Sequence, residues 1–441
     1  MDTPIYDFLR SYAGSGTVRC HMPGHKGREL FPDGLGTALD ITEINGADSL
    51  FEADGIIRRS EQGMSALYGT ADTFYSAGGS TLCIQAMLAA MKQENRTVIA
   101  VRNVHRAFLN AAALLWLDVE WVMPDYTDGI LSGTIRPGDI ESRLADHPNA
   151  CVYLTSPDYT GRTADIQAIA EICHRFGAPL LVDNAHGAHL HFLPASCHPI
   201  ALGADICCDS AHKMLPALTG AAMLHTSSGH YAGVLRQCMS LFASTSPSYL
   251  IMASLDLCRG YISEQIRGDI ERNLTELDRL RRTFADRLRF AEGDPFHVTI
   301  KAAESGYDGN ETAELLRRNG VECEYADRGL VVLLMSPMST CDDYEKLTAA
   351  LGSSLAAAKK YVPKPDSIVL PLPERAMSIR DAVFAPSEEI PVDEAEGRIC
   401  AAVKVPCPPA VPIAASGEVI DRRCIDAFRR YGIGTVNVVR R

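Results

Sequence analysis

The stretches PLLVDNAHGAH (179–189) and ADICCDSAHK (204–213) decide the fold. Each begins with a short apolar run and ends in polar residues. RTVIAVR (96–102), ACVYLTSP (150–157) and GAAMLH (220–225) begin in the same way, and amphipathic segments separate them. Short runs rich in Val, Ile and Leu that alternate with helical segments predict buried strands of a mostly parallel sheet. We therefore expect an α/β fold with helices on both faces of a central sheet.

The rest of the chain divides into further segments. Residues 261–290 place apolar side chains at steps of three or four, which predicts one long amphipathic helix. Strands and helices follow it up to about residue 360, and the proline-rich stretch 361–375 is expected to be a connector. The predicted order is an N-terminal arm (1–30), a large domain (31–260), a smaller α/β domain after the linking helix (261–360) and a C-terminal segment (361–441).

Composition excludes several classes of protein. The chain has 441 residues, of which 46% are hydrophobic and 22% charged, enough for a large buried core. A net charge of -13 argues against a nucleic-acid partner and fits a small cationic substrate better. No run has the length of a signal peptide or a membrane span, so we expect a cytoplasmic protein. The fourteen cysteines are scattered, which favours reduced thiols over disulfides.

Two residues at the ends of predicted strands could carry chemistry. Asp183 ends the run PLLV, and Lys213 follows ADICCDSAH. Ligands of open parallel sheets bind outside the carboxyl ends of the strands, so both side chains are expected at one edge. An amine and a carboxylate placed there are what pyridoxal phosphate (PLP) requires. A surface lysine and a helix-capping aspartate would give the same pattern, so the pair alone does not decide.

A possible phosphate site lies in YSAGGSTLCIQAMLAAM (75–91). Two glycines precede Ser80 and Thr81, and an apolar helix follows. Backbone N–H groups and hydroxyls at the N-terminus of a helix can bind a phosphate, although a plain helix cap explains Ser80 equally well. The stretch lacks the GK[ST] ending of a nucleotide P-loop. Ser210, three residues before Lys213, could add another hydroxyl.

The histidines of DNAHGAHLHF allow a metal hypothesis, which we do not favour. His186, His189 and His191 are close in sequence, but they do not share one strand face and have no acidic residue at ligand spacing. We expect no metal site here, and we interpret His189 and His191 as core residues.

Six motifs together resemble a known family. They are HMPGHKG (21–27), RNVHRA (102–107), DNAHGAH (183–189), SAHK followed by LTG (210–220), STSPSYLIMASLD (244–256) and PPAVPIAASGE (408–418). In this order, from about Tyr6 to the C-terminus, the chain resembles the Orn/Lys/Arg decarboxylases, specifically their compact bacterial members. The resemblance implies a fold type I PLP enzyme, a homodimer or higher homo-oligomer whose active sites are shared between subunits, and a place in polyamine biosynthesis.

The resemblance also implies roles for individual residues. Lys213 would be the Schiff-base lysine, and Asp183 the partner of the pyridine nitrogen. His212 would be an acid near the substrate Cα. The other residues expected to contact the cofactor are Ser80, Thr81 and Ser210 at the phosphate, His105 above the ring, Ala185 beneath it, and Thr245 and Ser246 toward a neighbouring subunit's phosphate.

The substrate that the resemblance implies is a basic amino acid, with arginine ahead of lysine and ornithine. A long cationic side chain calls for a carboxylate in its pocket. Glu418 is the first candidate, and Asp48 and Glu52 are the reserves. Transamination, side-chain elimination and a non-catalytic regulatory paralogue remain open alternatives, because the same lysine and aspartate serve many PLP reactions.

Five positions depart from the family pattern. Asn184 stands where Glu is usual, Gly220 where Gln is common, and Asp158 where Thr is usual. Ala410 and Ala415 replace a Gly and a Pro. None of them removes the lysine, the aspartate or the phosphate hydroxyls, so these departures bear on the choice of substrate rather than on cofactor binding.

Overall fold

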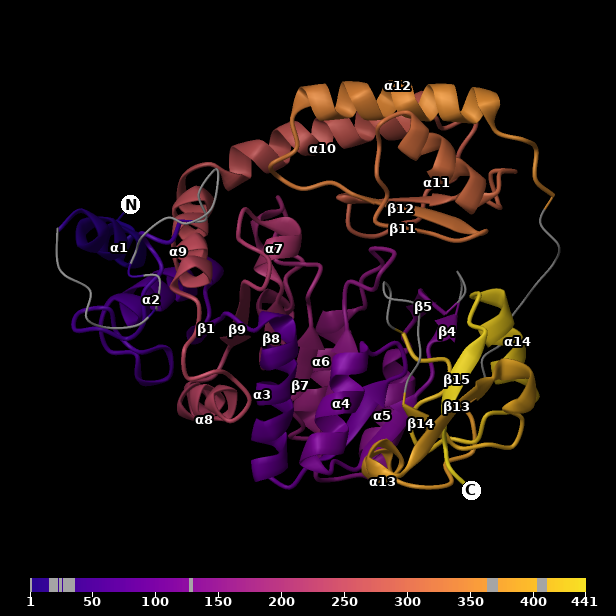
Figure 1. Ribbon diagram of the computed structural model, residues 1–441, viewed down its shortest axis with the longest axis horizontal. Helices are drawn as coiled ribbons and strands as arrows, with labels where there is room; N and C mark the ends of the chain where they lie inside the picture. Colours follow the sequence, from indigo (N-terminus) through magenta and orange to yellow (C-terminus); the bar gives the residue numbers. More distant parts are fainter. Residues whose placement is uncertain are drawn as a thin grey trace. The chain divides into compact units, whose positions relative to one another are not determined.

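The computed structural model describes residues 2–15, 23, 26, 36–126, 130–362, 372–402 and 411–441. They form two compact units, one made of residues 1–95 and 179–270 and the other of residues 96–178 and 271–441. Figure 1 labels many of their helices and strands. These units do not coincide with the four segments expected from the sequence, and that finer division stays a prediction. Most of the HMPGHKG motif, together with Ala410, lies outside the described residues.

The first unit contains four neighbouring strands in the order β1-β9-β8-β7. They are β1 (Asp72–Ser76), β7 (Leu180–Asp183), β8 (Ile206–Asp209) and β9 (Ala222–Thr226), and all their residues are buried. β7 and β8 are parallel, while β9 is antiparallel to both β8 and β1. The carboxyl ends of β1, β7 and β8 therefore lie at one edge, which we call the carboxyl edge of the first unit.

Helices pack around these strands. The longer ones are α1 (Pro4–Gly14), α2 (Ile56–Tyr68), α3 (Gly79–Gln93), α8 (Gly229–Ser240) and α9 (Tyr249–Glu264). The short helix α7 (Ala211–Met214) directly follows β8, and 3-10 turns span Leu50–Glu52, Leu190–Phe192 and Pro199–Leu202. α3 packs on β1, β7, β8 and β9, so one apolar helix covers the strands that carry the candidate residues.

The second unit begins with three parallel strands in the order β6-β2-β3. The strands are β2 (Thr97–Val101), β3 (Val119–Val122) and β6 (Ala150–Thr155), with the helices α4 (Arg106–Leu115), α5 (Pro137–Asp146) and α6 (Ile166–Arg175) between or after them. A small ribbon pairs β4 (Asp125–Tyr126) with β5 (Gly133–Thr134).

Two small antiparallel sheets complete the second unit. The first has the order β10-β12-β11 and comprises β10 (His297–Lys301), β11 (Tyr325–Ala326) and β12 (Leu330–Leu334), with α11 (Gly309–Arg318) and α12 (Cys341–Ala357) packed above it (Figure 1). The second has the order β13-β15-β14 and comprises β13 (Ser387–Pro391), β14 (Cys400–Ala402) and β15 (Thr435–Val439), near α13 (Ile379–Phe384), the 3-10 turn Val392–Glu394 and α14 (Arg422–Arg430). Ile425, Phe428, Val436 and Val438 form its buried core.

The five strands expected from the apolar runs are confirmed as β2, β6, β7, β8 and β9. The single long helix over 261–290 is wrong. α9 ends at Glu264, Gln265 leaves the helical conformation, and α10 spans Ile266–Thr283. Ile262, Ile266 and Ile270 remain buried on either side of the break. Because the apolar spacing continues through Gln265, periodicity could not reveal the break.

Two other expectations concern thiols and membranes. The twelve cysteines within the described ranges are free, and most are buried, which agrees with the expectation of reduced thiols. In the described part of the chain, no helix combines the length and apolar character that crossing a bilayer needs.

Candidate active site

Lys213 lies at the carboxyl edge of the first unit, in the short helix α7 that follows β8. Its side chain is exposed, and Nζ lies 2.9 Å from Nε2 of His186, a residue that is only 6% exposed. His186 belongs to the loop that begins directly after β7. The two loops that leave β7 and β8 thus meet at the amine of Lys213.

Asp183 begins the same loop as His186. It is the last residue of β7, is 2% exposed and pairs in register with Cys208 on β8. Its Oδ1 accepts a hydrogen bond from the backbone N–H of Ala185 at 3.2 Å and lies 3.7 Å from Sγ of Cys208. The structure therefore places a buried carboxylate and the contact of Lys213 within four consecutive residues, at the edge where the sequence predicted them.

The candidate phosphate hydroxyls also meet at this edge. Ser210 Oγ donates a hydrogen bond to Ser80 Oγ at 2.9 Å, which joins the start of α7 to the start of α3. Gly79 has a φ of +68°, a conformation that favours glycine and that lets the chain turn from β1 into α3. The backbone N–H groups in the first turn of α3 have no hydrogen-bond partner within the helix. They lie at the positive end of the helix dipole, which favours a bound anion.

A pocket of the first unit includes Gly78 and Thr81 in its lining, together with Ser246 and Pro247. Thr245, the neighbour of Ser246, is exposed. The first unit therefore brings Thr81 and Ser246 to the same pocket.

Three remaining candidates have separate surroundings. Nδ1 of His212 lies 2.9 Å from the carbonyl oxygen of Ala221, and this contact fixes the ring next to Lys213. Ala185 is 8% exposed in the loop after β7. His105 belongs to the second unit, where it caps α4 and accepts a hydrogen bond from Ala107 N–H at 3.2 Å.

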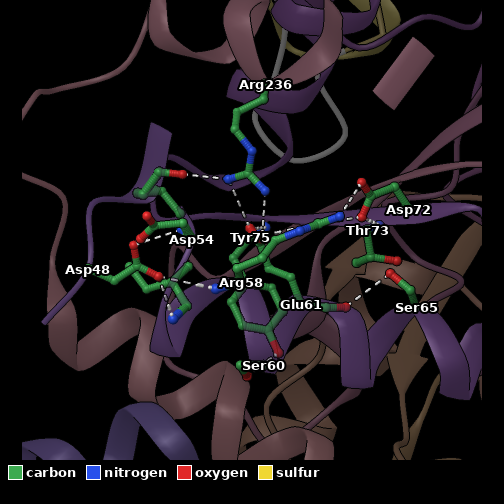
Figure 2. Close-up of polar contacts among 12 residues, drawn as sticks. Asp48, Asp54, Arg58, Ser60, Glu61, Ser65, Asp72, Thr73, Tyr75 and Arg236 are labelled. Atoms are coloured by element: carbon green, nitrogen blue, oxygen red, sulfur yellow. Dashed lines mark hydrogen bonds and ion pairs between the residues drawn. The ribbon is translucent and has the colours of Figure 1, made fainter. Parts of the chain in front are cut away.

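Asp48, a reserve candidate for the substrate, organises a loop. Its carboxylate accepts hydrogen bonds from the backbone N–H groups of Ser49, Asp54, Gly55, Ile57 and Arg58, at 2.9–3.3 Å. Figure 2 shows it beside Asp54 in a larger polar cluster. In that cluster Arg58 binds Asp72, and Arg236 binds Glu61. Glu52, the other reserve, accepts a hydrogen bond from Ser49 Oγ at 2.7 Å.

Glu418, the first candidate for the substrate, lies in a buried ion pair of the second unit. Arg102 donates to Oε1 at 2.8 Å and to Oε2 at 2.6 Å, and Ala415 N–H donates to Oε2 at 2.7 Å. Glu418 is 3% exposed and Arg102 is 2% exposed, and the guanidinium stacks 4.8 Å from the Trp121 ring. This bidentate ion pair indicates that the carboxylate has a structural role. Its recognition of a substrate stays a prediction.

Two residues at these sites were missed by the sequence interpretation. His186 was considered only as a metal ligand. Because it follows Asp183 by three residues, it could have been expected at the same sheet edge as Lys213. Arg102 follows the run TVIAV directly, just as Asp183 ends PLLV. The rule that polar residues at strand ends deserve inspection could have found it.

Three of the five departures from the family pattern have distinct local surroundings. Asn184 donates a hydrogen bond to Asp209 at 2.6 Å. Gly220 has a φ of +95°, which a side chain would strain, and its carbonyl accepts from Gly79 N–H. Asp158 is buried, and burial raises its pKa while hydrogen bonds from Thr160 and Arg162 act against that rise.

Comparison with known proteins agrees with these features. A family model described as "Orn/Lys/Arg decarboxylase, major domain" matches residues 3–299, and the model of the C-terminal domain of that family matches residues 358–431. The chain is 31% identical to the uncharacterized protein YaaO of Bacillus subtilis, over 98% of this chain and 94% of that one. It is 30% identical to an arginine decarboxylase of Bacillus subtilis, over 95% of this chain and 91% of that one.

Solved structures show the same fold. A lysine decarboxylase of Pseudomonas aeruginosa aligns with a TM-score of 0.83 at 17% identity, over 99% of this chain and 80% of that one. A Francisella novicida lysine decarboxylase aligns with a TM-score of 0.81 at 16% identity, over 99% of this chain and 81% of that one. The enzyme SPT, solved with PLP, aligns over 70% of this chain and 80% of that one, with a TM-score of 0.56 at 13% identity. The expected fold type I architecture with a smaller C-terminal domain is confirmed.

Proposed function

Because the chain belongs to the Orn/Lys/Arg decarboxylase family, we propose that it is a PLP-dependent decarboxylase of a basic amino acid, with arginine the first substrate to test. The observation that carries the proposal is the meeting of Lys213 with the loop that follows Asp183. The serine pair that could hold a phosphate lies at the same edge.

The described residues fit PLP. Lys213 offers an exposed primary amine for covalent attachment, and Asp183 offers a buried carboxylate that can hold a proton on the pyridine nitrogen. Ser80, Thr81 and Ser210 offer hydroxyls to the phosphate beside the first turn of α3. Ala185 would pack beneath the ring, and His105 would stack above it.

The cofactor, when bound, would act as an electron sink for the pair that remains on the substrate Cα after CO₂ leaves. The chain has to orient the bond to the carboxylate, exclude water and return a proton to Cα. His212 and Lys213 are the candidate donors of that proton, since they are adjacent and a nitrogen of each can carry it. His186 would position the lysine amine through its contact with Nζ.

The same proposal covers assembly and setting. The active enzyme would be a homodimer or higher homo-oligomer in the cytoplasm, serving polyamine biosynthesis, with Thr245 and Ser246 reaching a neighbouring subunit's phosphate site. The placement of Ser246 beside Thr81 in one pocket supports a part for this segment near the phosphate. Glu418 and Asp48 were predicted from the sequence as substrate carboxylates, but the contacts of Glu418 with Arg102 and of Asp48 with backbone N–H groups favour a structural part for both.

A substrate panel tests the proposed activity. PLP-loaded protein is incubated separately with arginine, lysine and ornithine, and CO₂ and the amine products are measured, with the Lys213→Ala variant as the control. We expect CO₂ and the matching amine from at least one of the three. Accumulation of a keto acid would indicate transamination, bound PLP without any product would indicate a regulatory paralogue, and either result would overturn the proposal.

A further inference from the structure

A second group of reactive side chains lies on one face of the first unit's strands, apart from Lys213. Cys207 and Asp209 are two residues apart on β8, so both point to the same face. His225 on β9 is the direct cross-strand partner of Cys207 and shares that face. His198, just before the 3-10 turn Pro199–Leu202, adds a ring from a loop. We call these four residues the His–Cys–Asp cluster.

Three residues of this cluster, His198, Cys207 and Asp209, bring their ligand atoms within 4.8 Å of one another. Nε2 of His198 lies 3.1 Å from Oδ2 of Asp209 and 3.8 Å from Sγ of Cys207. Nε2 of His225 lies 3.3 Å from the same Oδ2. A tetrahedral zinc ion with bonds of about 2.0–2.3 Å separates its ligand atoms by roughly 3.3–3.6 Å. The observed separations are close to the edges of such a coordination shell.

Other contacts orient the ligands of the cluster. Nδ1 of His225 lies 2.9 Å from Oγ1 of Thr73, which directs Nε2 toward Oδ2 of Asp209. Oδ1 of Asp209 accepts a hydrogen bond from Asn184 at 2.6 Å, which leaves Oδ2 facing the two rings. Metal-binding histidines and carboxylates are commonly held in this way by groups on their far side.

Charge and burial select the kind of ligand. His198, Cys207, Asp209 and His225 are each 0% exposed. A thiolate and a carboxylate together carry two negative charges, and two neutral imidazoles add none, so a divalent cation leaves the buried site neutral. A donor set that combines imidazole nitrogen, sulfur and carboxylate oxygen is typical of zinc.

We propose that His198, Cys207 and Asp209 bind a zinc ion in a closed structural site, with His225 beside it in contact with Asp209. Each of these side chains is fully buried, which leaves a substrate no access to the ion. Asp209, a proposed ligand, precedes Ser210 and accepts a hydrogen bond from Asn184, which follows Asp183. The ion would therefore stabilise the carboxyl edge that carries Asp183 and Ser210. The sequence interpretation expected no metal and weighed His186, His189 and His191. Among the described residues, the group of possible metal ligands that the structure brings together consists of His198, Cys207 and Asp209.

Metal analysis of the intact holoenzyme tests this site. Protein expressed with zinc, purified without a metal-affinity tag and dialysed should contain about one zinc ion per chain by mass spectrometry of the elements. X-ray absorption at the zinc edge should show sulfur and nitrogen neighbours. A folded, PLP-loaded protein with less than about one tenth of an ion per chain would overturn the proposal, as would a shell of oxygen and nitrogen alone.

Variants locate the ion. Cys207→Ser and His198→Gln should each lower the zinc content about tenfold or more, whereas Cys258→Ser, which removes a buried thiol of α9 outside the cluster, should keep it. Unchanged zinc content in the first two variants would refute the assignment. If they fail to fold, the absorption spectrum of the wild-type protein decides. Lys213→Ala should retain zinc while losing activity, so failure of the metal site and failure of the proposed function are distinguishable.

Discussion

Lys213 in the first unit and Arg102 in the second are two cations beside strand ends with opposite surroundings. Lys213 is exposed, and its amine contacts the imidazole nitrogen of His186. Arg102 is 2% exposed, and both of its terminal nitrogens bind the carboxylate of Glu418. The amine can therefore be reached and can react, whereas the guanidinium is held as a permanent charge.

This difference separates chemical roles from structural ones. A buried carboxylate with strong donors on both oxygens contributes to stability by neutralising the charge of its partner. Removing it leaves that partner as a buried, uncompensated charge. A reachable amine can be removed with little effect on packing. Changes at Lys213 should thus act on activity, and changes at Glu418 should act first on stability.

The largest effect is expected at Lys213. Lys213→Ala should lower kcat/KM for the preferred amino acid by at least about 10³-fold, because the attachment point of the cofactor is lost. The melting temperature of the cofactor-free protein should change little, since the side chain is exposed. Activity and thermal unfolding are measured on the same preparation. Activity within tenfold of the wild type would show that Lys213 is not the attachment point of the cofactor.

The next largest effect is expected at Glu418. Glu418→Gln should lower the free energy of unfolding by about 3–5 kcal/mol, because Arg102 stays buried without a counter-charge. Chemical denaturation measures the loss, and the double variant Arg102→Met with Glu418→Leu, which removes both charges, should recover much of it. If Glu418→Gln instead left stability unchanged and raised KM for arginine alone, the substrate prediction for Glu418 would stand in place of the structural role.

Asp183 is also a buried carboxylate, but we propose for it a chemical role at the pyridine nitrogen of the cofactor. Asp183→Asn should lower kcat roughly 10²-fold or more and weaken PLP binding far less, because the amide cannot hold the positive charge of a protonated ring. Steady-state kinetics at saturating PLP and a PLP titration provide the two readouts. Equal activity in the variant would remove Asp183 from the mechanism.

Asp48 should show the smallest effect. Asp48→Asn replaces a carboxylate that accepts hydrogen bonds from five backbone N–H groups. The change should lower the free energy of unfolding by about 1–3 kcal/mol. The preference among basic amino acids should stay the same. Asp54→Asn, at an exposed position in the same loop, is the matched control and should be neutral. A change in substrate preference without loss of stability would place Asp48 at the substrate instead.

Local sequence determined much of the fold. Strands β7 and β8 were predictable because every residue in them is buried, so their apolar runs are uninterrupted. The positions of Asp183 and Lys213 followed from these strands by the geometry of parallel sheets. The break at Gln265 was hidden because the apolar stripe continues in register on both sides of it.

Contacts between distant segments could not be predicted in the same way. Arg102 and Glu418 are 316 residues apart, and neither local sequence indicates the other. Ser80 and Ser210 were both proposed for the phosphate, but only the structure brings them within 2.9 Å. The cluster of His198, Cys207, Asp209 and His225 depends on the pairing of β8 with β9, which composition and spacing do not specify.

One measurement tests the role of Lys213 most directly. PLP-loaded protein is reduced with borohydride, which fixes the cofactor on its lysine as a stable secondary amine, and the digested peptides are mapped by mass spectrometry. We expect the added mass of the reduced cofactor on Lys213. Label on another lysine, or no label on a protein that has bound PLP, would contradict it.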